Sequence, residues 1–411
     1  MLRVLHVSQQ FPCEAYPALG VMVQNSVRAL APLVDQSVLA PRPYTLPIPG
    51  FPYGRLAQLP ARRIESGYWV HRPHYLYLVP KRWLYPQAGP AMARAFKRYA
   101  EQLGPPDVIH AHWSYPDGWA ARALRDLFGC KLVVHARGTL ERVIAQQGPR
   151  FRALVATPLQ AADAVIANSE ALQRDCLELG VSADKLSVIP NGVDLRLFTP
   201  ADKSESKRAL GLHPQRMLLL YCGNLRPVKG VDLLSQALPE LCAARPELDV
   251  ALVGSGELAA TLAREHAALI ETGRVRMTGA LPQSEVARYM QAADLLVLPS
   301  RSEARGNVIL EALASRTPVA AAEVGGIPEL MRESHGLLFA PGDPRALLRA
   351  LLTLTAAPER LAQLGAAGEQ FARESGLTWQ AHAEKTAALY HRLTGSRGRR
   401  SGLRVVRCSA D

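Results

Sequence analysis

The chain has 411 residues, of which 48% are apolar and 20% are charged. This length is too great for one small hydrophobic core, so the chain should form two domains or three. Lysine and arginine exceed aspartate and glutamate by 12, and this excess favours anionic partners such as nucleotide phosphates, acidic lipid headgroups or nucleic acid. No charge-free apolar run reaches the roughly 18 residues that a membrane-spanning helix needs, so any membrane role should be peripheral.

The start of the chain, MLRVLHVSQQFP, becomes polar too early for a signal peptide, and it is predicted to be a first β-strand followed by a turn. The cysteines are scattered and show neither a CxxC pair nor a zinc-binding spacing. They are predicted to be reduced thiols of a cytosolic protein. The six are Cys13, Cys130, Cys176, Cys222, Cys242 and Cys408.

Short β-rich apolar runs recur along the chain, each followed by a longer helical pattern. Such runs are typical of strands buried on both faces, and their alternation with helices predicts parallel βαβ sheets. The runs of the first half lie at 3–8, 107–113, 131–138, 164–169 and 186–192. Those of the second half lie at 217–225, 249–256, 274–281, 295–301 and 318–326.

A polar, turn-rich segment separates the two series and places a domain boundary near 195–212. The predicted fold class is therefore α/β, with two tandem Rossmann-like domains. Residues 41–60 form a proline-rich insertion that no regular element should occupy. Helical spacing predicts a C-terminal helix after the second domain, followed by a basic, disordered tail. The predicted units are 1–195, 196–376, 377–394 for the helix and 395–411 for the tail.

The first candidate site follows the strand at 217–225, where the chain reads CGNLRPVKG. The turn places Asn224, Arg226 and Lys229 near the start of a helix, where free N–H groups and the positive end of the helix dipole favour anions. Two cations beside such a helix start suit a pyrophosphate. The alternative is a solvated loop before a surface helix.

The second candidate site contains Glu303 and Glu311, separated by seven residues, around Arg305-Gly306-Asn307 at the start of an apolar helix. Gly306 allows a ligand to approach the backbone, and Asn307 is a good N-cap. Glu311 falls about one turn into the helix, where its carboxylate can accept both hydroxyls of a ribose. The pattern predicts a nucleotide-sugar site with phosphate on the helix amides. The alternative is two ordinary surface glutamates.

These residues resemble glycosyltransferase family 4, the retaining enzymes of GT-B fold, over nearly the whole chain to about residue 393. The most specific element is Glu303-x7-Glu311 with Gly306-Asn307-Val308. Supporting motifs are GNLRPVKG (223–230), VGSGEL (253–258), GGIPEL (325–330), NSEAL (168–172) and IPNGVD (189–194). HAHWSYPDGWAA (110–121) and RGT (137–139) look like a subgroup associated with bacterial exopolysaccharide and cell-wall polymers.

The resemblance implies a role for each matching position. Lys229, with Arg226 beside it, would bind the donor pyrophosphate and act in catalysis. Glu303, the second catalytic residue, would lie at the reacting face of the donor sugar, and Glu311 would hold the ribose hydroxyls. The further donor-binding positions are Gly20 after the first strand, Asn224, Gly254, Leu281 in the segment facing the base, and the backbone amides of Gly306, Asn307 and Val308.

The chain departs from the family pattern in two places. Asn224 stands where an arginine is common, so either Arg226 compensates or the phosphate is held more weakly. After the third strand, Arg137-Gly138-Thr139 replaces an HG-x-D-like motif, so its histidine and aspartate are both missing. Candidates to orient the acceptor or the donor sugar are then His110, His112, His135 and Arg137.

The resemblance also implies the reaction. A sugar would move from a UDP- or GDP-sugar to a glycan or lipid-linked acceptor, with retained anomeric configuration, in exopolysaccharide or cell-envelope glycan synthesis. The first domain would bind the acceptor, the second would bind the donor across a cleft, and the C-terminal helix would return to the first domain. Because the chain has no DxD motif to hold a metal, neither a metal nor another cofactor is expected. Lys229 and Arg226 would neutralise the leaving diphosphate instead.

Other interpretations stay open. His110-x-His112 lies on a strand with both side chains on one face, and with His135 it could form a tri-histidine zinc site. A GT-B-fold sugar-nucleotide epimerase or hydrolase would use the same donor site without an acceptor cleft. A non-catalytic binder of anionic polymers would fit the basic tail but would gain nothing from Glu303 and Glu311, and nucleic acid is not an expected partner.

Residues 54–98 combine nine basic residues and one acid, Glu65, with many aromatic residues. This mixture suits a membrane interface, where each basic residue near an anionic leaflet adds about 1 kcal/mol. We therefore expect a cytoplasmic protein that can dock on the inner face of the membrane to reach a lipid-linked acceptor. The alternative is a solvated helical face over an aromatic core. The aromatic residues are Tyr68, Trp69, Tyr75, Tyr77, Trp83, Tyr85 and Phe96.

Overall fold

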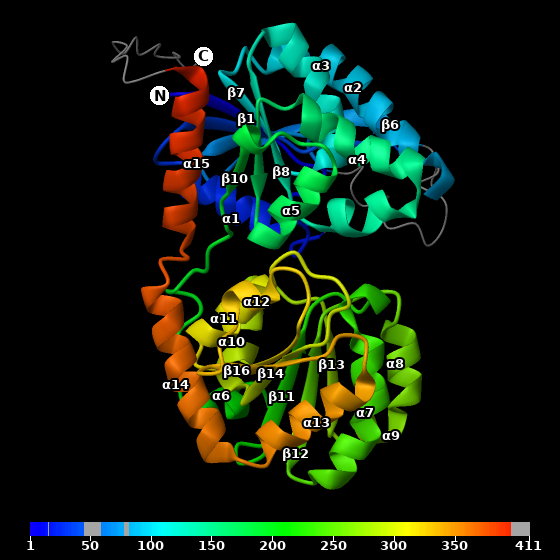
Figure 1. The fold of residues 1–411 in the computed structure, drawn as a ribbon, viewed down its shortest axis with the longest axis vertical. Coiled ribbons are helices and arrows are strands. Elements are labelled where there is room, and N and C mark those ends of the chain that lie inside the picture. The colour runs from blue at the N-terminus through cyan, green and yellow to red at the C-terminus, as the bar shows by residue number, and fades with distance from the viewer. Residues whose placement is uncertain (15, 45–58, 78–81, 396–411) are drawn as a thin grey trace.

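The computed structural model describes residues 1–14, 16–44, 59–77 and 82–395. Over these residues the chain forms two α/β domains, one above the other in Figure 1. The last helix, α15 (Trp379–Thr394), leaves the second domain and runs back along the first. Residues 396–411 of the predicted tail lie outside the described part of the chain.

The first domain contains an eight-stranded sheet with the order β10-β9-β8-β7-β1-β2-β5-β4. All neighbouring strands are parallel except β4 and β5. The strands are β1 Arg3–Val7, β2 Asp35–Leu39, β4 Arg62–Glu65, β5 Tyr68–His71, β7 Val108–Ala111, β8 Lys131–Ala136, β9 Ala164–Ala167 and β10 Leu186–Val188. The helices are α1 Val21–Leu30, α2 Ala88–Tyr99, α3 Trp119–Phe128, α4 Pro149–Ala161 and α5 Glu170–Glu178.

The second domain contains a six-stranded parallel sheet with the order β13-β12-β11-β14-β15-β16. Its strands are β11 Met217–Cys222, β12 Leu248–Val253, β13 Val275–Gly279, β14 Leu295–Leu298, β15 Val319–Ala322 and β16 Gly336–Phe339. Its helices are α6 Lys203–Ala209, α7 Val231–Ala244, α8 Ala259–Glu265, α9 Ala267–Glu271, α10 Gln283–Ala292, α11 Asn307–Ala314, α12 Ile327–Leu330, α13 Pro344–Thr355 and α14 Pro358–Glu374.

All ten apolar runs identified in the sequence contain a strand. The strands that the runs missed are short or polar, such as β2 (DQSVL) and β4 (RRIE), and they owe their conformation to sheet pairing. Short 3₁₀ and π-helical turns also occur in the described part of the chain. They are η2 Arg82–Gln87, η3 Ala100–Gln102, η4 Ser114–Gly118, η5 Leu140–Ile144, η6 Ala145–Gln147, η7 Ala183–Lys185 and η8 Pro227–Lys229.

The expectation that residues 41–60 hold no regular element is wrong for its first part. A short strand, β3 (Arg42–Tyr44), pairs in parallel with β6 (His74–Leu76). The strand tolerates Pro43 because the hydrogen bonds on either side use the N–H of Arg42 and the carbonyl of Tyr44. Residues 45–58 of the insertion lie outside the described residues.

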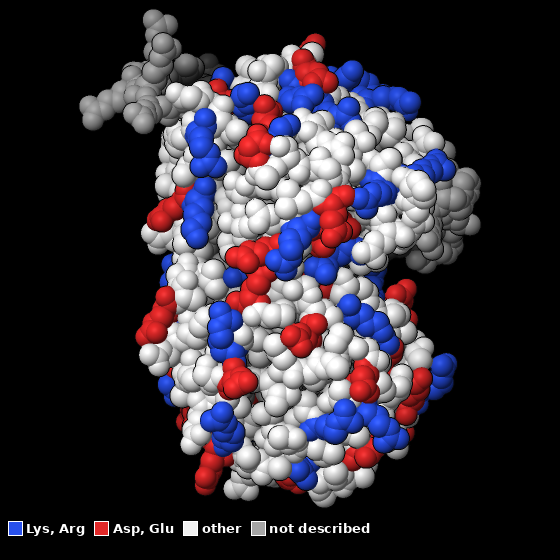
Figure 2. All heavy atoms as spheres, viewed as in Figure 1, with Lys and Arg blue, Asp and Glu red and all other residues white. Residues whose placement is uncertain are grey.

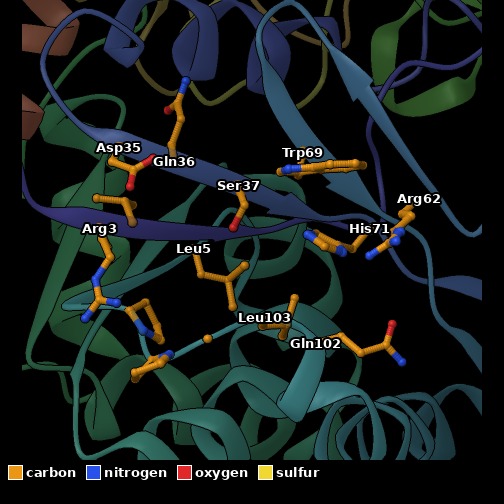
Figure 3. A pocket seen from close by; sticks show the side chains of 14 residues that line it. Arg3, Leu5, Asp35, Gln36, Ser37, Arg62, Trp69, His71, Gln102 and Leu103 are labelled. Atoms are coloured by element: carbon orange, nitrogen blue, oxygen red, sulfur yellow. The ribbon is translucent and has the colours of Figure 1, made fainter. Parts of the chain in front are cut away.

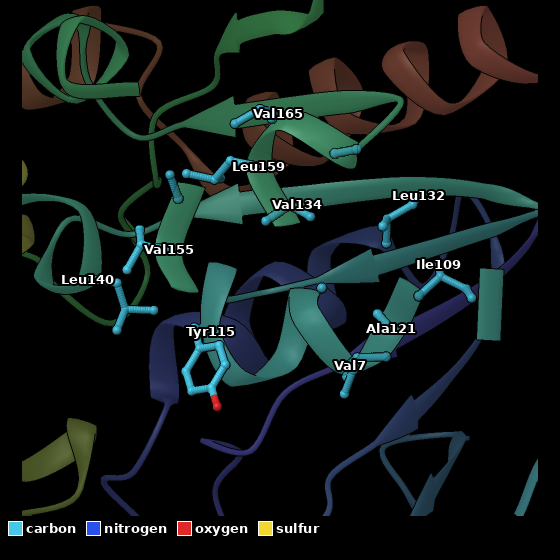
Figure 4. Packing of buried hydrophobic residues seen from close by; sticks show 14 of the residues in the cluster. Val7, Ile109, Tyr115, Ala121, Leu132, Val134, Leu140, Val155, Leu159 and Val165 are labelled. Carbon is cyan, nitrogen blue, oxygen red and sulfur yellow. The ribbon is translucent and has the colours of Figure 1, made fainter. Parts of the chain in front are cut away.

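The sheet of the first domain is buried on one face by α2, α3 and α4. Val7, Ile109 and Val134 from neighbouring strands meet Val155 and Leu159 of α4 in the cluster shown in Figure 4. All five side chains are 0% exposed, and burial of each contributes about 1.5–3 kcal/mol.

The opposite face of this sheet is covered by α1 and by the returning helix α15. Alternate residues of the same strands, Val4, Val108 and Val133, pack against Ala383 and Tyr390 of α15. A helix that follows the second domain in sequence therefore completes the core of the first. Among the described helices, none has the length and apolar character to cross a membrane.

Candidate functional site

The loops after β11 and β14 meet at the point where the strand order of the second sheet reverses. β12 lies on one side of β11 and β14 on the other, and open α/β sheets bind ligands at such a switch point. Lys229 lies in the turn η8 after β11, and Glu303 lies in the loop after β14. Two residues 74 positions apart in sequence thus come from neighbouring strand ends.

Lys229 and Glu303 are in direct contact. The Lys229 Nζ lies 2.6 Å from the Glu303 Oε2, and the two side chains are 26% and 14% exposed. The other oxygen, Oε1, accepts a hydrogen bond from the N–H of Ala304 at 3.2 Å. A half-buried cation is therefore held beside a half-buried acid, and an incoming diphosphate would compete with that acid for the lysine.

Backbone contacts fix the position of this pair. The N–H groups of Arg301 and Ser302 donate to the carbonyl of Val228, at 3.0 and 3.3 Å. Gly230 follows Lys229, and a Cβ at this position would lie 1.8 Å from the carbonyl oxygen of Pro299. The two loops are therefore joined backbone to backbone, which places the cation and the acid before any ligand arrives.

Helix α11 begins at Asn307, not after it. The predicted N-cap, Asn307, is the first helical residue, because Gly306 adopts the left-handed conformation (φ 81°) and takes the cap position. The Asn307 Oδ1 instead accepts a hydrogen bond from the Nδ2 of Asn191 at 3.3 Å. The first-turn amides of Asn307 and Val308 lack intrahelical acceptors, as at any helix start, and are available to an anion.

Glu311 lies one turn into α11 and is 6% exposed. Burial raises the pKa of its carboxyl to about 7. Its Oε1 accepts from the Nε2 of Gln283 at 3.4 Å, and the Oε1 of Gln283 accepts from the Nδ2 of Asn25 at 3.2 Å. Asn25 belongs to α1 of the first domain. Two hydrogen bonds in series therefore link Glu311, the predicted ribose-binding residue, to the other domain.

The remaining donor-binding candidates surround this region on loops. Asn224 and Arg226 are exposed before α7, and Leu281 is half-buried before α10. Gly254 follows β12, with its N–H bonded to the carbonyl of Gly279 at 2.9 Å. Gly20 (φ 72°) caps α1 against the carbonyl of Gln10, where a Cβ would approach to 2.1 Å. A side chain at Gly20 would therefore displace the loop after β1.

The two domains touch through motifs identified in the sequence. The Ser169 hydroxyl of NSEAL donates to the carbonyl of Ala304 at 2.7 Å. Glu329 of GGIPEL accepts from the N–H groups of Glu170 and Ala171, at 3.1 and 2.8 Å. A carboxylate from the second domain thus caps helix α5 of the first, an arrangement favoured by the helix dipole.

His110, His112 and His135 lie inside the first domain, and each is 0% exposed. His6 of β1 is in register with His110 of β7, and all four rings face α1 and α15. The His110 Nδ1 lies 2.5 Å from the hydroxyl of Tyr390 on α15. This arrangement does not support direct sugar contact by the three histidines, because they fill the space between the sheet and the returning helix.

The hydrogen bonds of this cluster have a fixed direction. Arg137 has only donors, so its Nη2 donates to the Nδ1 of His112 at 2.8 Å. The Nε2 of His112 then donates to the Nδ1 of His6 at 3.0 Å, and the Nε2 of His6 donates to Gln36 at 3.1 Å. The chain ends at the carbonyl of Val27, which accepts from Gln36 at 2.8 Å. The rings are neutral in this network.

The geometry also changes the zinc alternative. The ring nitrogens that lie within 4.8 Å of one another belong to His6, His110 and His112, not to the predicted set with His135. His135 instead bonds Asn168 at 2.7 Å. A metal at the first three would need the nitrogens that already join His112 to His6, beside the guanidinium of Arg137. Both conditions disfavour a cation there.

Two buried acids near this cluster were missed by the sequence analysis. Glu141 accepts from the Ser114 hydroxyl at 2.8 Å and from the N–H of Gly138 at 2.9 Å. Asp117 accepts from the N–H of Gln9 at 3.1 Å. Burial raises the pKa of both carboxyls. Asp117 lies within the quoted motif HAHWSYPDGWAA, which was the available signal, whereas no local pattern marks Glu141.

The aromatic residues of 54–98 are mostly core residues. Tyr68, Tyr75 and Phe96 are 5% exposed or less, whereas Trp69 is 43% exposed. For the buried aromatic residues, the prediction of a membrane-facing role is wrong, because Tyr75 and Phe96 pack in the core with α2 and Tyr68 packs with residues of α1 on the other face of the sheet. Residues 54–58 and 78–81 lie outside the described residues, as does the side chain of Trp83.

Comparison with known proteins agrees with this geometry. Residues 19–197 match the family described as Glycosyltransferase Family 4, and residues 202–371 match the family described as Glycosyl transferases group 1. A D-inositol 3-phosphate glycosyltransferase of Thermobispora bispora is 34% identical over 304 residues, which are 69% of this chain and 70% of that protein. TuaC of Bacillus subtilis, whose name assigns it to teichuronic acid biosynthesis, is 30% identical over 357 residues, 85% of this chain and 88% of TuaC. The solved sucrose-phosphate synthase of Thermosynechococcus elongatus has a TM-score of 0.79 and 25% identity, covering 96% of this chain and 100% of that one.

Proposed function

Because the chain belongs to glycosyltransferase family 4 and has the GT-B fold, we propose that it transfers a sugar from a UDP- or GDP-sugar to a glycan or lipid-linked acceptor. The transfer retains the anomeric configuration and needs no metal ion. The observation that carries the proposal is the contact of Lys229 with Glu303 at the switch point of the second sheet, in the loop that leads into α11, where Glu311 lies one turn after the first helical residue. A non-catalytic polymer binder is set aside, because the chain is a glycosyltransferase by family.

The proposed step needs positive charge where the leaving diphosphate forms. Lys229, Arg226 and the first amides of α11 supply that charge, which is the role a metal has in other glycosyltransferases. The bond from the anomeric carbon to the phosphate oxygen breaks, and the acceptor oxygen forms its bond on the same face. The acceptor hydroxyl proton passes to the leaving phosphate oxygen. When the diphosphate takes the place of Glu303 beside Lys229, the Glu303 carboxylate is free to accept hydrogen bonds from hydroxyls of the donor sugar.

The proposed acceptor class is supported by the name of one relative. The TuaC match covers most of both chains, and the name of TuaC refers to teichuronic acid biosynthesis. We therefore propose an acceptor in exopolysaccharide or cell-envelope glycan synthesis. The first domain would bind that acceptor and the second the donor. The name of the inositol phosphate enzyme points to a smaller, anionic acceptor, which belongs in the same test.

The first experiment screens nucleotide sugars for thermal stabilisation of the protein. A ligand at 100 times its Kd adds about 2.7 kcal/mol of stability, so the true donor should stand out from other nucleotides. Product formed from that donor with glycan, lipid-linked and inositol phosphate acceptors is then analysed by NMR, with and without EDTA. An inverted product, loss of activity in EDTA, or an epimerised or merely hydrolysed donor would each contradict part of the proposal.

Peripheral membrane contact is proposed on a smaller set of residues than the sequence suggested. Arg94, Lys97 and Arg98 are exposed on α2, and Figure 2 shows basic side chains at the outer end of the first domain, where α2 and α3 lie. We infer that this end approaches the anionic inner leaflet of the membrane. Liposome sedimentation of the protein and of the triple Gln variant at these positions tests the contact. Equal binding to neutral and anionic vesicles would count against it.

A further inference from the structure

A hollow of about 300 Å³ lies on the sheet of the first domain, away from the strand ends that carry the proposed donor site. It opens near the amino ends of β1 and β2 and extends across β5 toward the edge strand β4. In Figure 3, Arg3 and Asp35 lie at one end, and Trp69, His71 and Arg62 lie at the other. A volume of this size is within the range of small-ligand pockets.

Strand register explains why the hollow exists. Leu5, Ser37 and Trp69 stand side by side on β1, β2 and β5, so their side chains share one face of the sheet. Helix α2 and turn η3 cover β1 on this face, and the covering layer ends with Gln102 and Leu103. Because the side chain of Ser37 is small, the surface of the sheet is recessed between Leu5 and the indole of Trp69.

Four of the polar side chains that line the hollow have no partners among the described residues. The side chains of Arg3, Asp35, Ser37 and Gln102 form no hydrogen bond or ion pair within residues 1–14, 16–44, 59–77 and 82–395. They include donors, acceptors and one hydroxyl that can act as either. A ligand rich in hydroxyl groups could replace the water on all four.

The aromatic wall is held in place. Trp69 is 43% exposed, and the guanidinium carbon of Arg62 lies 5.3 Å from the centre of its ring. His71 lies next along β5, with its ring centre 6.2 Å from that of Trp69, and its Nδ1 is 3.2 Å from the hydroxyl of Tyr99. The indole is thus a flat apolar surface, held by its neighbours, beside solvent-accessible polar side chains.

We propose that this hollow is a second glycan-binding site, separate from the site of transfer. A sugar ring has apolar C–H faces that suit an indole and equatorial hydroxyls that suit planar polar groups such as those of Arg3, Asp35 and Gln102. From Arg3 to the row of His71 the strands advance about four residues, roughly 13 Å, which is longer than a single ring. The bound ligand would be an oligosaccharide segment. Only its identity as the acceptor or product glycan rests on the proposed function.

The test is electrophoresis through gels that contain a polysaccharide, with dextran as a neutral probe and polygalacturonate as an acidic probe. Trp69→Ala removes the platform, and Ser37→Leu fills the hollow. Leu127→Ala removes an apolar side chain on α3 that is 56% exposed, against 43% for Trp69, and lies outside the hollow. We expect the wild type and L127A to be retarded alike by at least one probe, and W69A and S37L to lose at least fivefold in apparent affinity.

Two controls keep the outcome clear. The folding of each variant is checked by its Tm, and donor binding is checked by thermal stabilisation with nucleotide sugars, which should be the same in all four proteins. If the wild type is not retarded by either polysaccharide, or if W69A and S37L are retarded as strongly as the wild type, the proposal fails while donor binding can still hold. Loss of liposome binding in W69A with unchanged polysaccharide binding would identify the face as a lipid contact and would also overturn the proposal.

Discussion

The two domains place polar residues at the carboxyl ends of their central strands, and they use them in opposite ways. In the first domain, His6, His110 and His112 are 0% exposed and bonded to one another or to α15. In the second domain, Lys229 and Glu303 are partly exposed and bonded to each other. Both sets come from the same architecture and from the same edge of a parallel sheet.

The difference lies in what covers each edge. Helix α15 brings Tyr390 and His382 onto the first set, where His382 bonds both the hydroxyl of Ser26 and the carbonyl of Pro190, at 2.8 and 2.9 Å. Most of the hydrogen-bonding capacity of the first set is therefore used within the protein, and among the described residues only the Nε2 of His110 in this set lacks a partner. In the second set, the acids keep acceptor capacity that the described residues do not fill. Polar residues at strand ends are available to a ligand where no neighbouring element occupies their hydrogen-bond donors and acceptors.

The largest expected effect is the acid sensitivity of the first set. Burial lowers the pKa of His6 and His382 to about 4 and that of His110, His112 and His135 well below 6.5. A group whose pKa is lowered on folding contributes stability above its unfolded pKa and loses it as the pH falls. The free energy of unfolding should therefore drop as the pH decreases from about 6.5 toward 4. The drop is about 1.4 kcal/mol per pH unit for each proton that the unfolded state binds and the folded state does not.

Urea unfolding between pH 7 and pH 5 measures this slope. His6→Asn should reduce it by about one proton, whereas His213→Gln, at an exposed position, should leave it unchanged. Buried Asp117 and Glu141 have raised pKa values and oppose the trend, so the difference between variant and wild type is the informative quantity. Equal slopes for H6N and wild type would show that the cluster does not stay neutral.

The second set should respond in activity instead of stability. Lys229→Ala removes the cation closest to Glu303 and, by the proposed mechanism, a donor to the leaving diphosphate. We expect kcat to fall by roughly 10²–10³-fold, the usual cost of losing one transition-state donor, with little change in Tm. Lys385→Ala on the exposed face of α15 is the matched control. Near-normal turnover of K229A would remove Lys229 from the mechanism.

Glu311 should show a pH dependence opposite in sign to that of the histidines. Its pKa is raised on folding to about 7, so its contribution to stability is present at low pH and is lost as the pH rises through 7. Glu311→Gln should therefore gain up to about 3 kcal/mol in unfolding free energy relative to wild type between pH 5 and pH 8. Stabilisation by the donor should be weakened in the same variant.

Chemical denaturation at the two pH values, with Glu384→Gln on α15 as control, measures this gain. A variant that is equally destabilised at both pH values would mean that the carboxylate is not desolvated in the folded protein. Unchanged donor binding would remove Glu311 from the ribose site without affecting the stability result.

The smallest expected effect concerns the hydrogen bonds that link α1 of the first domain to Glu311 of the second through Gln283. Asn25→Ala and Gln283→Ala each cut the chain from α1 to Glu311. One neutral hydrogen bond contributes about 0.5–1.5 kcal/mol, so we expect a few-fold loss of donor affinity in each variant. The two losses should be non-additive in a double-mutant cycle measured by calorimetry. Fully additive losses would show that the side chains act independently.

Much of the fold was predictable from local patterns. Ten apolar runs marked ten strands, because strands buried on both faces need continuous apolar sequence. The approach of Lys229 to Glu303 was also predictable, since loops that follow parallel strands emerge at one edge of the sheet. Strands β4 and β5 were not, because each is only four residues long and its extended conformation depends on pairing, of β5 with β2 and of the polar edge strand β4 with β5.

By itself, the sequence determined the family, the two-domain α/β architecture and the membership of the charged cluster around Lys229. These features depend on periodicity and on motifs a few residues long. Only the tertiary structure decided that His110, His112 and His135 are sealed, that His6 joins them, and that Gln283 connects Glu311 to Asn25. The physical reason is distance along the chain: His6 and His112 are 106 residues apart, and His110 and Tyr390 are 280 apart. No local sequence pattern predicts whether a histidine at the end of a strand will face solvent or will be covered by a helix from the C-terminal end of the chain.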